Sequence, residues 1–204
     1  MTPRRPDRRG SRGQSVIEFA ILVPVFMLIL LGMLEFGLLF NRHITVEYGS
    51  REGARTGAAL ANGGGARGCA AGQSPNAASV DPQVVAATER VLKASGSAVN
   101  LALVTEIRIY KAAADGTPVA GKINLWRYAP GAGPTVDGEA LDFVPVSGSQ
   151  GWPACSRDNG STPDSIGVGL SYRYELTTPL MNLLGIQSIA IDDRTIMALN
   201  PTGV

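Results

Sequence analysis

The sequence predicts an α+β protein: a long amino-terminal membrane-spanning helix leads into a small domain with a mostly antiparallel sheet and one packed helix. Residues 16–40 are apolar over a length that can cross a bilayer. Residues 84–92 carry apolar side chains at helical spacing, and four later segments alternate between apolar and polar residues as strands do. Only 17% of the 204 residues are charged, which is sparse for a soluble domain.

The predicted membrane helix contains two acids, Glu18 and Glu35, and otherwise reads as an uninterrupted apolar run, VIEFAILVPVFMLILLGMLEFGLLF. Its helical length would be roughly 37 Å, whereas the hydrocarbon core of a bilayer is roughly 30 Å thick. A cleavable secretory signal is the alternative, but its apolar core would be shorter and would end in a small-x-small site. Residues 34–38 read LEFGL instead, so we expect a single retained span.

The charge distribution predicts the orientation of this span. Five arginines and one acid, Asp7, give residues 1–13 a formal charge of +4, while the whole chain carries +1. The positive-inside rule therefore predicts a cytoplasmic leader at 1–13, a helix with its extension at 14–61, and an extracytoplasmic domain at 62–204. We expect a single-pass protein of the inner or cytoplasmic membrane. Nucleic-acid binding is excluded, because no basic cluster follows residue 13.

Three glycines mark one face of the predicted helix extension. Gly49, Gly53 and Gly57 recur every four residues and therefore lie on one stripe, although each costs up to about 1 kcal/mol relative to alanine inside a helix. A stripe without side chains lets another backbone approach closely. We expect a docking face for a partner helix or for the domain's own sheet; the alternative is a helix that frays near Gly49 into a flexible neck.

The external domain should contain one amphipathic helix and four strands. The helix is expected to begin at Asp81 as a capping acid, with Pro82 in the first turn, and to stop at Gly96. Residues 179–185 suggest a short helical crossover, and residues 129–165 a long loop or an added strand pair. The strands are expected at 105–110 and 123–126, which form a hairpin through Asp115-Gly116, and at 168–176 and 189–199.

The two acids of the membrane helix differ in depth. Glu18 lies at the cytoplasmic end, and Glu35 lies roughly 25 Å further along, at the opposite headgroup region. Acids in a span are expensive, so we consider two explanations for Glu35: that it reaches interfacial water, or that it takes part in assembly. For Glu18, the flanking residues give a more specific indication.

Residues 12–18, RGQSVIE, place Gly13 between a basic leader and an apolar helix, with Glu18 at the fifth position after that glycine. This pattern resembles a type IV prepilin, or class III, processing site. The resemblance implies that a membrane prepilin peptidase cuts on the cytoplasmic side after Gly13 and leaves Gln14 as the new amino terminus. The freed amine could then pair with Glu18 in its own helix or in a neighbouring subunit, which would make Glu18 an assembly residue.

The resemblance narrows to one family. The segments GQSVIEFA at 13–20, LG at 31–32, EFG at 35–37 and SREGAR at 50–55 resemble TadE-like pseudopilins of tight-adherence (Flp) pilus systems, and residues 168–201 do so more loosely. The resemblance implies a pilin-like fold and a minor, membrane-anchored component of a Tad/Flp-type pilus assembly or secretion system. Its partners would be other pilins or pseudopilins and the Tad platform proteins. A monomeric, membrane-anchored extracellular ligand-binding domain is the alternative.

Few residues suggest catalysis, a cofactor or a metal. Cys69 and Cys155 favour a disulfide in an exported domain, with two free buried thiols as the alternative, and they are too few for a metal site. The sole histidine, His43, is expected at the membrane boundary, so no enzyme is predicted. Residues 158–164 suggest a polar turn rather than a calcium loop, and residues 192–194, DDR, a solvated turn or bulge.

Overall fold

The computed structural model describes residues 11–60, 77–160, 162–178 and 185–200. It confirms the predicted class: a long amino-terminal helix is followed by a small antiparallel sheet and a second helix. The helices and the strands of the main sheet are α1 (Ser11–Leu60), α2 (Val80–Leu92), β1 (Val104–Ala112), β2 (Pro118–Tyr128), β5 (Phe143–Gln150), β6 (Ser165–Glu175) and β7 (Ser188–Ala198). Short elements complete the description: η1 (Ala77–Ser79), η2 (Leu101–Leu103), η3 (Ala154–Ser156) and the strand pair β3 (Thr135–Val136) and β4 (Glu139–Ala140).

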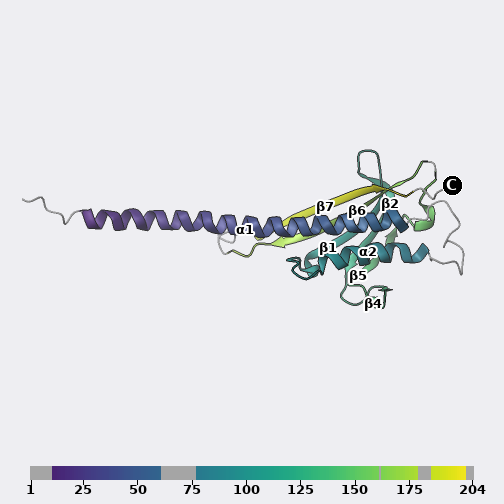
Figure 1. Ribbon diagram of the computed structural model, residues 1–204, viewed down its shortest axis with the longest axis horizontal. Coiled ribbons are helices and arrows are strands. Elements are labelled where there is room, and N and C mark those ends of the chain that lie inside the picture. Colours follow the sequence, from purple (N-terminus) through teal and green to yellow (C-terminus); the bar gives the residue numbers. More distant parts are fainter. Residues whose placement is uncertain (1–10, 61–76, 161, 179–184, 201–204) are drawn as a thin grey trace, which may run out of the picture.

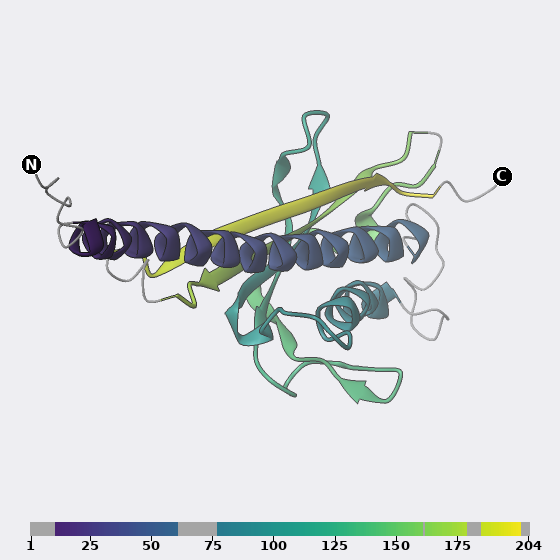
Figure 2. The ribbon, with the colours of Figure 1, turned by 60° about the vertical axis from the view of Figure 1, so that its left-hand side comes forward.

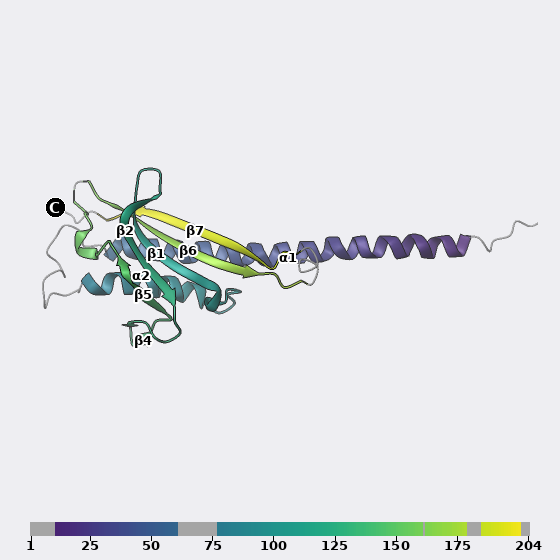
Figure 3. The same ribbon diagram turned by 180° about the vertical axis from the view of Figure 1, so that it is seen from behind.

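The domain has two layers, with the helices on one face of the sheet. Figure 1 shows the carboxyl half of α1 and the shorter α2 in front of the strands, and Figure 3 shows the strands from behind with the helices beyond them. The amino half of α1 extends away from the sheet (Figure 1). Figure 2 shows β7 running obliquely along α1. The carboxyl half of α1 therefore packs against the sheet as part of the folded domain.

Every neighbouring pair in the five-stranded sheet is antiparallel, and the strand order is β5-β2-β1-β6-β7. The predicted hairpin joins β1 and β2; at its turn the Asp115 carboxylate accepts the backbone N–H of Thr117, and Gly116 adopts a φ of +80°. The segment 129–165 contributes the small β3-β4 pair and one edge strand, β5, so it supplies more sheet than a simple loop.

Alternating side chains build the core between the sheet and the helices. Ile107 and Ile109 of β1 are fully buried, as are Val168 and Leu170 of β6, because every second residue of a strand faces the helices. From α1, Ala54 is fully buried too, and its small side chain lets the helix lie close to its neighbours. This alternation of apolar and polar residues is the pattern that predicts the strands from the sequence.

The strand β7 corrects one prediction. Residues Asp192, Asp193 and Arg194 form no turn or bulge, because β7 pairs with β6 in unbroken register from Ser188 to Ala198. Asp193 points to the helix side, where it accepts a hydrogen bond from the buried hydroxyl of Ser50 on α1. Asp192 lies on the other face and accepts a hydrogen bond from Arg108 Nη2 at 3.4 Å. Each charge therefore has a partner that lets the strand continue.

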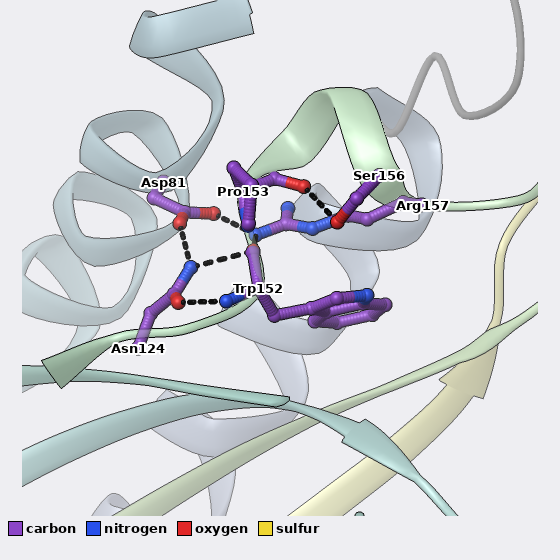
Figure 4. Close-up of polar contacts among 6 residues, drawn as sticks. All are labelled: Asp81, Asn124, Trp152, Pro153, Ser156 and Arg157. Carbon is purple, nitrogen blue, oxygen red and sulfur yellow. Dashed lines mark hydrogen bonds and ion pairs between the residues drawn. The ribbon is translucent and has the colours of Figure 1, made fainter. Parts of the chain in front are cut away.

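The start of α2 corrects a second prediction. Ser79, not Asp81, occupies the N-cap position, and its side chain makes no capping hydrogen bond. The Asp81 carboxylate instead accepts hydrogen bonds from Asn124 Nδ2 at 2.6 Å and from Arg157 Nη2 at 2.5 Å (Figure 4). The helix does end before Gly96, which adopts a φ of +90°. The acid at the start of α2 thus holds other segments rather than its own helix.

The polar cluster of Figure 4 fastens the segment after β5 to the domain. Asn124 of β2 accepts the backbone N–H of Trp152 at 2.8 Å and donates to the Trp152 carbonyl at 2.8 Å. The guanidinium of Arg157 lies 4.6 Å from the Trp152 ring centroid and is completely buried. A buried charge of this kind requires pairing, and Asp81 provides it. The cluster joins α2, β2 and the β5–β6 connection.

Candidate functional site: the exposed helix and its junction with the sheet

The amino half of α1 presents apolar side chains outward on all sides. The large apolar residues that α1 exposes between Val16 and Leu34 have exposed fractions from 37% at Leu31 to 68% at Phe19 and Met33. Among the described residues, α1 is the one helix that is long and apolar enough to cross a membrane. Water would hydrate this surface at a large free-energy cost, so it requires lipid tails or neighbouring apolar helices.

Gly13, Gln14 and Glu18 lie together near the start of this exposed helix. The side-chain amide of Gln14 donates to Glu18 Oε1 at 3.1 Å, one helical turn away. Gly13 is helical and exposed, with no atom within 4 Å of the position that a Cβ would occupy. The structure thus places the three residues on an accessible helical segment, and their role in processing and assembly stays a prediction.

Glu35 is buried, in contrast to the first of its two explanations, that it reaches interfacial water. Its side chain is 3% exposed, because the end of β6 covers it. Its carboxylate accepts a hydrogen bond from the Tyr174 hydroxyl at 2.5 Å and from the backbone N–H groups of Thr177 at 3.0 Å and Thr178 at 2.9 Å. Three donors replace water around the carboxylate, which makes its burial tolerable.

Arg42, seven residues or about two helical turns after Glu35, completes this junction. Its guanidinium lies 4.7 Å from the centroid of the Tyr174 ring. Burial, together with the hydrogen bond and the negative charge of Glu35, raises the pKa of Tyr174 to about 12, so the phenol stays protonated and can donate. We call Glu35, Arg42, Tyr174, Thr177 and Thr178 the helix–sheet junction. It fixes the end of β6 to the point where α1 leaves the domain.

The glycine stripe is covered by the chain's own elements. A Cβ at Gly49 would lie 3.2 Å from a methyl group of Leu92, and a Cβ at Gly57 would lie 2.5 Å from a methyl group of Ile166. A Cβ at Gly53 would overlap the hydroxyl of Thr88. These neighbours belong to α2 and β6, so the docking face receives the domain's own helix and sheet. The flexible-neck alternative is wrong, because α1 is helical through to Leu60.

Residues 13–55 match the family model described as TadE-like protein. The chain carries a TadE-like segment. The resemblance seen in the sequence is therefore confirmed for these residues. The comparisons with curated proteins and with solved structures find no match.

The TadE-like segment contains most of the site described above. It spans the exposed apolar half of α1 with Glu18, the buried Glu35, and the first two glycines of the stripe, Gly49 and Gly53. The match associates the chain with Tad pilus assembly. The rest of the junction comes from beyond the match, since Tyr174, Thr177 and Thr178 follow β1, β2 and β5 in the chain.

The remaining candidate residues occupy structural positions. His43 is half-buried on α1. Asp158 forms the expected polar turn: its carboxylate accepts the N–H of Gly160 at 2.8 Å, while the Asp164 carboxylate accepts the N–H of Asp158 at 3.0 Å and pairs with Lys111 at 2.5 Å. These carboxylates already serve backbone donors and an ammonium group. Among the described residues there is no group of three or more His, Cys, Asp or Glu side chains that could hold a metal ion.

Two predictions concern residues outside the described part of the chain. Cys155 lies in η3, but Cys69 is outside the described residues, so their pairing stays a prediction. The same holds for the helical crossover at 179–185, of which only Gly185 is described.

Sequence reasoning missed the partners of Glu35 and Asp81. Tyr174 follows Glu35 by 139 residues, and Arg157 follows Asp81 by 76. A single acid in an apolar helix indicated that Glu35 needs a partner, yet the sequence carries no signal that identifies which one.

Proposed function

We propose that the protein is a minor, pseudopilin-like, membrane-anchored component of a Tad/Flp-type pilus assembly or secretion system, with a structural rather than a catalytic role. One observation carries this proposal: the apolar half of α1, from Val16 to Leu34, is exposed within the segment that matches the TadE-like family. Such a surface suits lipid before assembly and other apolar helices after it.

The construction of the domain supports assembly through this helix. The helix–sheet junction holds β6 against α1 at Glu35, and the glycine stripe seats α2 and β6 further along. Because both contacts are made by the chain itself, α1 and the sheet move as one body. Placing the exposed helix among partner helices therefore also fixes the position of the sheet domain. The partners we propose are other pilins or pseudopilins and the Tad platform proteins.

The proposal includes orientation and processing. Residues 1–13 would stay in the cytoplasm because of their arginines, and the sheet domain would lie outside the inner or cytoplasmic membrane. A prepilin peptidase would remove the leader after Gly13. Glu18 would then lie four residues from the new amine of Gln14, at a depth where an unpaired charge is disfavoured.

An exchange of the exposed helix tests this function. Residues 19–34 are replaced by an unrelated apolar span of equal length, while Glu18, Glu35 and everything after them are kept. We expect normal membrane insertion and a folded sheet domain, but loss of pilus assembly and of co-purifying Tad components. Exchanges of leucine for isoleucine at the same exposed positions are the control and should be tolerated. Full function on the unrelated span would favour the monomeric ligand-binding alternative.

The pairing of Cys69 with Cys155 is a separate part of the proposal. A bridge would close a loop of about 87 residues, which the chain-entropy model values at about 4 to 5 kcal/mol before any strain. We expect titration of the denatured, exported protein to detect no free thiol unless a reductant is added. Two thiols per chain without reductant would contradict the pairing.

A further inference from the structure

The buried Glu35 marks the level at which α1 emerges from the bilayer. The twenty residues from Val16 to Glu35 span about 30 Å as a helix, which equals the thickness of a hydrocarbon core. The large apolar side chains before Glu35 are exposed, whereas Glu35 itself is enclosed by polar groups of the sheet domain. If α1 spans the membrane, as proposed above, one bilayer surface lies close to this residue.

The described residues at the two ends of the β6–β7 connection, 176–178 and 185–187, lie at the same level. The backbone N–H groups of Thr177 and Thr178, which open this connection, both donate to Glu35. At its other end, the Leu176 N–H donates to the Gln187 carbonyl at 3.3 Å, so the two sides of the connection remain paired. Figures 1 and 2 show β6 and β7 running along α1 to the place where the helix leaves the domain.

Four apolar side chains near this level are exposed. Ile186 is 44% exposed and Ile189 is 37% exposed. On α1, Phe36 and Phe40 stack at 6.5 Å and are also exposed. The sequence contains no charged residue from 176 to 191, and the charges of β6 at this end, Arg173 and Glu175, come before that stretch.

We propose that the membrane-proximal end of the β6–β7 pair is a second membrane contact, in which Ile186 and Ile189 lie in the lipid interface beside α1. The occupant is a lipid surface, because the hydrogen bonds to Glu35 place these side chains at the height where the spanning helix meets the headgroups. A single helix leaves the domain free to tilt and to rotate about the helix axis. A second contact removes that freedom and presents the sheet in one orientation. This inference rests on the membrane anchoring in the proposed function.

Tryptophan substitution and lipid quenching test the contact. The full chain is placed in phosphatidylcholine vesicles whose acyl chains carry bromine, which quenches nearby indoles, and the emission of the wild-type chain is subtracted. Ile186→Trp is compared with Ile196→Trp, since Ile196 lies at the opposite end of β7 with a similar exposure of 38%. Phe26→Trp, in the middle of the exposed helix, reports whether α1 itself is embedded. Gln187→Trp, also at an exposed position, repeats the test beside Ile186.

We expect the added emission of Ile186→Trp and Gln187→Trp to be blue-shifted and mostly lost in brominated vesicles, with Ile196→Trp unaffected. Quenching of Phe26→Trp alone would overturn the second contact and leave the membrane anchor intact. A blue shift without quenching would also overturn it, because a second copy or another protein would then cover the surface. Quenching at Ile196 as well would show that the sheet lies flat on the membrane, contrary to the proposal. Absence of quenching at all four positions would instead contradict the membrane anchor itself.

Discussion

Glu35 is the residue of α1 whose carboxylate binds the end of β6. It is enclosed at the base of the domain, and every donor that satisfies it comes from the β6 end: one hydroxyl and two backbone N–H groups. Hydrogen bonds to a charged group are stronger than neutral ones, and a buried donor that loses its acceptor is costly. At the junction, the Glu35 side chain therefore couples α1 to the end of β6.

Glu35→Gln should destabilise the domain by about 1.5–3 kcal/mol, because an amide lacks the charge and offers one acceptor oxygen where two are in use. Unfolding of the full chain in detergent can be followed through the buried Trp126 and Trp152. Glu47→Gln is the control: Glu47 pairs with exposed Arg51 on the same helix, and such pairs contribute about 0–1 kcal/mol. Equal effects of the two variants would contradict a special role for Glu35.

Tyr174 should make stability depend on alkaline pH. Its pKa rises from 10.0 to about 12 on folding, because burial and the neighbouring Glu35 both oppose a phenolate. The folded chain thus holds a proton that the unfolded chain releases, so this contribution is complete below pH 10 and is lost as the pH rises toward 12.

The measurement is the free energy of unfolding between pH 9 and pH 12. We expect the free energy of unfolding to fall less steeply with pH in Tyr174→Phe than in the parent chain. Part of the fall should remain, because burial also raises the pKa of Tyr110. Tyr48→Phe, at an exposed position of α1, should leave the decline as it is in the parent chain. An unchanged slope in Tyr174→Phe would show that the phenol ionises equally easily in both states.

At the scale of elements, α1 serves two environments with one continuous helix. Its first half exposes apolar side chains, and its second half packs against α2, β6 and β7. The glycine stripe explains the close packing, since side chains at those positions would occupy the space of Leu92, Thr88 and Ile166. The loss of helix propensity at three glycines is offset by contacts with α2 and β6.

Gly53→Ala should destabilise the domain by about 1–3 kcal/mol, even though alanine favours a helix by about 1 kcal/mol. A Cβ there would overlap the Thr88 hydroxyl, which is itself buried and bonded to the Val84 carbonyl at 3.0 Å. Gly37→Ala is the matched control on the same helix, because the new methyl group would meet no atom within 4 Å other than those of the adjoining residues and helix backbone. Chemical unfolding gives the free energy of unfolding of both variants. Equal stability of the two would mean that α1 and α2 can move apart to admit the methyl group at little cost. Leucine at Gly53 should be worse than alanine.

The elements were largely predictable from the sequence because their signals are local. Alternation at Ile107 and Ile109 indicated β1, and the apolar run from Val16 indicated the exposed half of α1. The errors arose where a polar residue has a distant partner. Asp193 resembled a turn residue because Ser50, which bonds it, precedes it by 143 positions. Asp81 resembled a helix cap because its partner Arg157 follows it by 76 positions. The site was predictable only in part: Gly13, Glu18 and the glycines follow a spacing, whereas the partners of Glu35 depend on the fold.

At the scale of the whole molecule, α1 would connect three compartments in the proposed orientation. Its fifty residues extend over about 75 Å, from the segment next to the basic leader, through the apolar half, to the sheet domain. Because the junction and the glycine stripe hold the sheet to α1, a displacement of the amino-terminal end of α1 along its axis would, in the proposed orientation, also displace the sheet domain. Leader removal would therefore set the level at which the helix is held among its neighbours.

The final prediction concerns the start of this helix. Gly13→Leu should block leader removal, since the proposed cleavage follows a glycine, and the mature protein would then retain its arginines. Glu18→Gln should leave insertion and processing intact but impair assembly, because the new amine of Gln14 would lose its carboxylate partner in a poorly hydrated place. Mass spectrometry of the amino terminus measures the first effect, and co-purification of Tad components measures the second.

Gln14→Ala is the control for the contact seen before cleavage. It removes the 3.1 Å hydrogen bond from Gln14 to Glu18 but keeps both the carboxylate and the future amine, so assembly should persist. A mature parent protein that still carries residues 4–12 would refute processing after Gly13. Glu18 would then have to pair with an arginine of an adjacent leader, and Arg12→Gln, rather than Gly13→Leu, would reproduce the loss of partners seen with Glu18→Gln.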